Sequence, residues 1–118
     1  MVDNITNYGK NGLYEWFFQR ITAVVICVYF IYLHYYVLTT PAEYGIWYSL
    51  YCNCFFKIFS TFVFMCVITH AWIGMWTIFT DYVTVLAVRT LLQIMLNILF
   101  FVLLVIFIDS LWFINGMW

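Results

Sequence analysis

The chain has 118 residues and a formal net charge of −1 at pH 7; 68% of its residues are hydrophobic and only 8% are charged. Together with a mean hydropathy of +1.03, this composition excludes a soluble globular protein and predicts an integral membrane protein. The four Lys and Arg residues are too few for a basic surface that binds nucleic acid. We expect a single membrane domain over residues 1–118, because no polar segment is long enough to form a second domain.

The first sixteen residues are polar to amphipathic, with Gly9 and Gly12 as turn signals. We expect this lead to lie at the membrane surface and to end at Arg20. It lacks the basic start, the short apolar core and the small-residue cleavage site of a secretory signal. The helix that follows is therefore expected to remain in the mature protein.

Three apolar ranges are long enough to cross the bilayer as helices. The connection over residues 39–56 holds the sole proline and several aromatic residues, and is predicted to be interfacial with part-helical character. A second connection, over residues 80–88, is short. The predicted fold class is an all-α integral membrane protein, with three transmembrane helices and a short amphipathic N-terminal lead. The approximate spans are residues 21–38, 58–79 and 90–108.

The few cations indicate the orientation in the membrane, because cytoplasmic loops carry an excess of Lys and Arg. With three spans, the lead and the second connection lie on the same side of the bilayer. That side carries Lys10, Arg20 and Arg89, whereas the other side carries only Lys57. The N-terminus is therefore predicted to be cytoplasmic.

A histidine interrupts the second span. Arg20 and Asp81 are both expected at the cytoplasmic boundary, which places His70 about 16 Å deeper at 1.5 Å per residue. An ionisable side chain at that depth usually faces a partner, a cavity or a cofactor. At about 100° per residue, the helix face of His70 also carries Val63, Cys66, Val67, Ile73, Gly74, Thr77 and Asp81.

Two roles are open for His70. Its imidazole is a suitable axial ligand for haem iron, and it is equally suited to a hydrogen bond with a neighbouring helix. Gly74 lies one turn away and leaves room for a flat ligand or for a close helix. A six-coordinate haem needs a second histidine, but His34 lies on another helix about 21 Å below the boundary. An interfacial position for His34 is the favoured interpretation.

Three further side chains have both a structural and a functional interpretation. Tyr82 is a membrane anchor or a hydrogen-bond donor to a quinone carbonyl, and Asp81 is a cap or a residue that orients the quinone or relays a proton. Arg20 is a boundary residue that reaches toward the lipid head groups, or a partner for haem propionates.

The cysteines predict neither a disulfide framework nor a complete metal site. Cys27 and Cys66 lie in spans, where a thiol usually packs as a small apolar group. Cys52 and Cys54 are too close in sequence for an easy disulfide, and two thiols do not complete a metal site.

The segment His70-Ala71-Trp72-Ile73-Gly74-Met75-Trp76 is followed, after four residues, by Asp81-Tyr82-Val83. Earlier in the chain stand Asn11-Gly12, Glu15-Trp16 and Arg20-Ile21-Thr22-Ala23. Together these motifs resemble those of the small hydrophobic membrane anchor subunit of bacterial succinate dehydrogenase, and the segment from His70 with its following Asp81-Tyr82-Val83 is highly specific. The chain departs from the pattern at Thr84-Val85, where related chains tend to carry Lys-Pro and so a proline that stops the helix.

This resemblance implies a three-helix anchor in the bacterial inner membrane. Members of the family join a second membrane anchor to hold the flavoprotein and iron–sulfur subunits, which contain the FAD and the iron–sulfur clusters. The resemblance implies that His70 is an axial ligand to the iron of a haem b shared with that second anchor, and that Arg20 lies near the haem propionates. It further implies that Tyr82, with Asp81 beside it, contributes to the ubiquinone site.

Three other functions remain as alternatives. A haem-free structural anchor would not need a buried histidine opposite a glycine. A fumarate reductase-type anchor shares the architecture. A small multidrug-type transporter would be expected to carry an acidic residue within the membrane early in the chain, and the first span has none.

Overall fold

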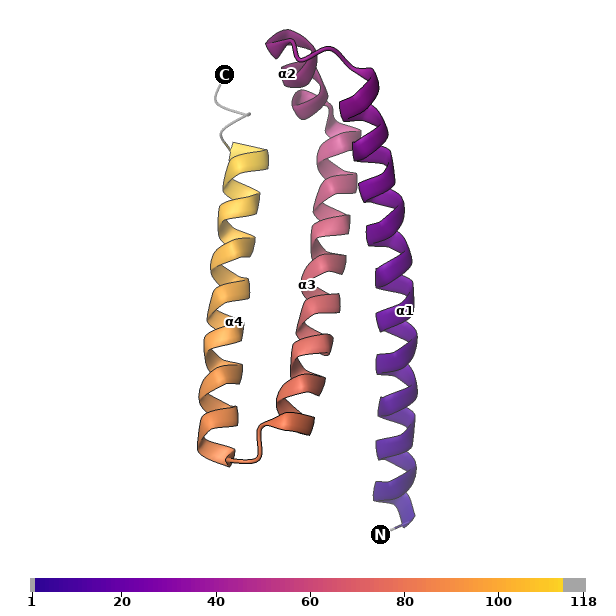
Figure 1. The fold of residues 1–118 in the computed structure, drawn as a ribbon, viewed down its shortest axis with the longest axis vertical. Helices are drawn as coiled ribbons and strands as arrows, with labels where there is room; N and C mark the ends of the chain where they lie inside the picture. Colours follow the sequence, from indigo (N-terminus) through magenta and orange to yellow (C-terminus); the bar gives the residue numbers. More distant parts are fainter. Residues whose placement is uncertain (1, 114–118) are drawn as a thin grey trace.

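The computed structural model describes residues 2–113, with side chains from residue 12 onward, and it is helical almost throughout (Figure 1). Three long helices run side by side, and the second of them along the chain lies between the first and the third. A short helix lies in the connection between the first and the second long helix and covers that end of the molecule. The helices are α1 (Val2–Thr39), α2 (Tyr44–Cys52), α3 (Cys54–Tyr82) and α4 (Leu86–Ile108), followed by a short π-helical segment, η1 (Asp109–Phe113).

The predicted fold class is confirmed, because the described residues form helices and no strands. Three stretches are long and apolar enough to cross a membrane: Gly12–Thr39, Cys54–Tyr82 and Leu86–Phe113. Each predicted span lies within one of these stretches. The helix α2 gives the first connection the part-helical character that its sequence predicts.

The N-terminal lead is helical and continues into the first span without a break. The turns expected at Gly9 and Gly12 are wrong, since α1 is one helix of 38 residues and no described glycine has a positive φ. An isolated glycine costs a helix only about 1 kcal/mol relative to alanine, and no proline precedes residue 41. In Figure 1 the N-terminal end of α1 extends beyond the turn that joins α3 to α4.

The ends of α3 depend on two different local features. At its start, the side-chain oxygen of Asn53 accepts hydrogen bonds from the backbone nitrogens of Phe55 and Phe56, at 2.9 and 3.3 Å. At its end no proline is needed, because Val83 is extended (φ −93°, ψ 105°) and begins a link of residues 83–85. The second connection is therefore shorter than the predicted range of residues 80–88.

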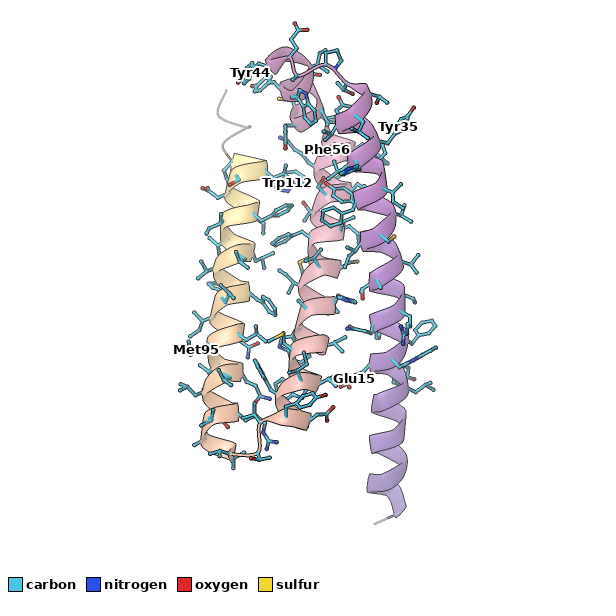
Figure 2. All side chains as sticks on the ribbon, in the orientation of Figure 1. Glu15, Tyr35, Tyr44, Phe56, Met95 and Trp112 are labelled. Carbon is cyan, nitrogen blue, oxygen red and sulfur yellow. The ribbon has the colours of Figure 1, made fainter. Side chains whose placement is uncertain are left out.

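Few side chains are buried within the chain itself. The buried residues among those described are Thr22, Phe56, Ser60, Val63, Cys66 and Leu111. Polar side chains join the helices: Tyr29 Oη of α1 lies 2.8 Å from Ser60 Oγ of α3, and Trp112 Nε1 donates to Thr61 Oγ1 at 3.0 Å. Figure 2 shows Trp112 between η1 and α3, whereas Met95 points away from α3 on the outer side of α4.

Candidate functional site

A groove of about 510 Å³ lies between α1 and α3, and it is open along one side. Figure 2 shows Glu15, one of its lining residues, on the side of α1 that faces α3. The lining residues recur every three or four positions on each helix, as expected when one face of each helix turns toward the other. They are Gly12, Glu15, Trp16, Gln19, Arg20 and Ala23 of α1, and His70, Ile73, Gly74 and Thr77 of α3.

The predicted face of His70 is confirmed for its nearest members, whereas Asp81, which was predicted on the same face, does not line this groove. Ile73, Gly74 and Thr77 line it together with His70, and Val63 and Cys66 are buried farther along α3. The helical period alone is enough to group these residues, because they belong to one regular helix.

The His70 ring is half-buried and contacts α1 through one nitrogen. His70 Nδ1 lies 3.2 Å from the hydroxyl oxygen of Thr22, a side chain that is 5% exposed. The same hydroxyl lies 2.7 Å from the carbonyl oxygen of Phe18 and 3.1 Å from that of Gln19. Thr22 belongs to one of the segments that carry the family resemblance, but the sequence analysis did not identify it as a site residue. The available signal was a threonine in an apolar run, three residues after Gln19.

Arg20 lines the same groove as His70, so the predicted separation of about 16 Å between their levels is wrong. Arg20 lies only two residues from Thr22, which contacts the His70 ring directly. The physical reason is the way α1 and α3 are aligned: the contact between Thr22 and His70 places Arg20 within two residues, about 3 Å along α1, of the level of His70. The guanidinium of Arg20 lies over the Trp16 ring, 5.6 Å from its centroid.

Gln19 is the second residue that sequence reasoning missed. Its Oε1 atom is buried and has no hydrogen-bond partner among the described residues. Its Nε2 atom lies 3.3 Å from the position that a Cβ on Gly74 would occupy. The space left by Gly74 is therefore used by a side chain of the neighbouring helix, one of the two uses that the sequence allowed.

Asp81 and Tyr82 lie outside the groove, at the end of α3. Both side chains are exposed, and Tyr82 is 80% exposed. The structure brings Arg20 and His70 together, but it does not bring either of them to Tyr82. A ligand that contacts Tyr82 would form a separate site at this end of the molecule.

The remaining candidates lie away from the groove. His34 is exposed and does not line it, and Cys27, Cys52 and Cys54 are exposed free thiols. A hydrogen bond with the Cys52 side chain raises the pKa of the Tyr48 phenol in α2. In the described part of the chain, no three His, Cys, Asp or Glu side chains gather to hold a metal ion. A metal bound at His70 would need its other ligands from a cofactor or another chain.

The fold defines a multi-pass, all-α membrane protein with a histidine-lined groove between two spans. Residues 2–108 match the family model for the succinate dehydrogenase/fumarate reductase transmembrane subunit. The chain is also 36% identical over 112 residues to the succinate dehydrogenase hydrophobic membrane anchor subunit of Coxiella burnetii, covering 94% of this chain and 97% of the relative. The chain belongs to the family of succinate dehydrogenase/fumarate reductase transmembrane subunits, as a hydrophobic membrane anchor.

Proposed function

We propose that this chain is the small hydrophobic anchor of a bacterial succinate:quinone oxidoreductase. In this role its single membrane domain spans the inner membrane with the N-terminus on the cytoplasmic side, and it pairs with a second membrane anchor. The flavoprotein and iron–sulfur subunits, which carry FAD and the iron–sulfur clusters, bind to this anchor pair and oxidise succinate. Membership of the anchor family supports the proposal, and the name of the Coxiella burnetii relative favours succinate dehydrogenase over the fumarate reductase alternative.

The observation that carries the cofactor assignment is the presence of His70 and Arg20 in one open groove. The side chains in the groove fit haem b: the His70 imidazole suits the iron, and the Arg20 guanidinium suits a propionate. When bound, haem would accept and donate one electron at a time. The open side of the groove suits a second axial histidine from the second anchor, since His34 does not line the groove.

Tyr82 and Asp81 are proposed to contribute to the ubiquinone site. A phenol can donate one hydrogen bond to a quinone carbonyl, and a neighbouring carboxylate can orient the quinone or relay a proton. Their exposure at the end of α3 leaves both side chains available to a site that other subunits complete. A haem-free structural anchor would need neither the pair of His70 and Arg20 nor the pair of Tyr82 and Asp81. No contact among the described residues favours that alternative.

The cofactor assignment is tested by His70→Ala in the intact purified complex, with His34→Ala as the matched control. We expect His70→Ala to lower the haem content per complex or to perturb the reduced α-band, because one of two axial bonds is lost. His34→Ala should leave both unchanged, since this histidine is exposed and outside the groove. Only preparations with the native ratio of subunits are compared. An unchanged bis-histidine spectrum in His70→Ala would refute haem ligation by this residue.

A further inference from the structure

We propose that Thr22 is the positioning residue of His70, holding the imidazole so that its proton lies on Nδ1 and its Nε2 lone pair is free for the haem iron. This inference rests on the proposed haem site and assigns a role within it to a residue of α1. It starts from the contact of 3.2 Å between Thr22 Oγ1 and His70 Nδ1, which joins residues 48 positions apart.

The direction of this hydrogen bond follows from the number of protons available. A threonine hydroxyl has one proton to donate and two lone pairs, whereas a carbonyl oxygen can only accept. Thr22 Oγ1 lies 2.7 Å from the Phe18 carbonyl oxygen, which is shorter than its distance to the histidine. The hydroxyl proton therefore goes to the backbone of α1, as is common for threonine in a helix.

The hydroxyl lone pairs then face His70, so the ring nitrogen must be the donor. A neutral imidazole with its proton on Nδ1 carries its free lone pair on Nε2. No hydrogen bond to His70 Nε2 is present among the described residues, and the ring lines the groove. Metal-binding histidines generally donate their second ring nitrogen to a neighbouring acceptor, which sets the ring orientation and raises the basicity of the ligating nitrogen.

Thr22 is also buried, so its contribution to packing must be separated from its hydrogen bond. Thr22→Val keeps the branched shape but removes the acceptor, whereas Thr22→Ser keeps the hydroxyl but removes the methyl group. Thr22→Ala removes both. A packing role predicts damage in the serine variant, and a positioning role predicts damage in the valine variant.

The experiment uses the intact complex and two measurements that do not depend on turnover: the rate of haem transfer to apomyoglobin and the haem midpoint potential. In Thr22→Val and Thr22→Ala we expect haem to leave about tenfold faster, the lower end of the effect of losing such a partner. The potential should rise, because a less basic ligand stabilises ferric iron less. A threefold loss of relative affinity for the ferric form corresponds to about 28 mV, at 59 mV per tenfold for one electron.

The serine variant should behave like the native complex in both measurements. Thr39→Val is the control, because Thr39 donates to the Tyr35 carbonyl oxygen on the same helix but lies outside the groove. If the valine variant does not assemble, the comparison of serine with alanine decides, since these two differ only in the hydroxyl.

Native behaviour of both Thr22→Val and Thr22→Ala would overturn the role of Thr22 and leave the haem site intact. Damage in the serine variant alongside a native valine variant would also overturn it, in favour of packing. If the native complex purifies without haem, the proposed haem site and this inference would be overturned together, so the two failures are distinguishable.

Discussion

A Cβ added to Gly74 would lie 3.3 Å from the Nε2 atom of Gln19, across the interface between α1 and α3. This separation is tight, but the Gln19 amide is the end of a flexible side chain beside a groove and can move. Because Gln19 lines the groove, a displaced amide would take up space in the groove where haem is proposed to bind.

Gly74→Ala should therefore leave assembly intact and lower the haem content of the purified complex, and Gly74→Leu should lower it further. The alanine itself favours the helix by about 1 kcal/mol, so reduced helix stability would not explain the loss. Haem per complex is the measurement. Gly45→Ala is the matched control, because a Cβ at Gly45 meets nothing within 4 Å. Full haem content in Gly74→Leu would contradict a haem packed against this position.

Arg20→Gln should lower the haem midpoint potential. Removing a positive charge beside the proposed haem should stabilise its oxidised form, which carries one more positive charge, by on the order of 1 kcal/mol. Arg20→Lys should retain most of the native potential. Arg89→Gln removes a cation that does not line the groove, so redox titration should give a native value for it. Equal midpoint potentials in Arg20→Gln and Arg89→Gln would show that Arg20 does not lie beside the haem.

Tyr82→Phe should reduce quinone-linked activity while succinate oxidation by an artificial acceptor stays near native. The substitution keeps the ring and deletes the donor, which should cost about 1–3 kcal/mol, or roughly ten- to a hundredfold in quinone-reductase efficiency. The measurement is the ratio of the two activities in one preparation. Tyr44→Phe is a close control, since Tyr44 is 81% exposed and Tyr82 is 80% exposed, and Tyr44 lies in α2 at the opposite end. A ratio within about twofold of native would make Tyr82 an interfacial anchor only.

The hydroxyl pair of Tyr29 and Ser60 should contribute a small, measurable part of the stability. Hydrogen bonds between membrane helices average about 0.6 kcal/mol in double-mutant cycles. We expect that coupling from Tyr29→Phe and Ser60→Ala, alone and combined, in unfolding measurements on the complex in detergent. Haem content should not change, because neither residue lines the groove. A coupling near zero would show that the 2.8 Å contact stabilises nothing.

The proposed orientation places α2 on the periplasmic side of the membrane. Cys52 and Cys54 at its C-terminal end are exposed, so a membrane-impermeant thiol reagent should label them in right-side-out vesicles. Labelling should be lost in Cys52→Ser/Cys54→Ser. Labelling that occurs only in inverted vesicles would reverse the orientation.

Sequence could predict what depends on one helix at a time. The three spans follow from apolar length, and the association of His70 with Ile73, Gly74 and Thr77 follows from the helical period. The level of one helix against another could not be predicted, because it depends on contacts between residues far apart in the chain. The contact of Thr22 with His70 sets that level, and no spacing within either helix indicates it.

The two missed residues, Thr22 and Gln19, have a common physical explanation. Each is an uncharged polar side chain in an apolar helix, and its partner across the helix interface does not follow from the spacing of residues within α1; Thr22 in particular already bonds its own backbone. Only the neighbouring helix shows that the Thr22 hydroxyl also meets an imidazole and that the Gln19 amide lies against a glycine.

The scarcity of buried side chains changes what folding means for this chain. Helices in a bilayer satisfy their backbone hydrogen bonds internally, so each span is stable before it meets the others. With only Phe56, Val63, Cys66, Leu111, Thr22 and Ser60 buried in the described chain, little of the tertiary arrangement is enforced from within. The mutual positions of the helices are then completed by whatever covers their exposed faces. For this protein, the final positions of the helices are therefore reached only when partner chains bind to their exposed faces.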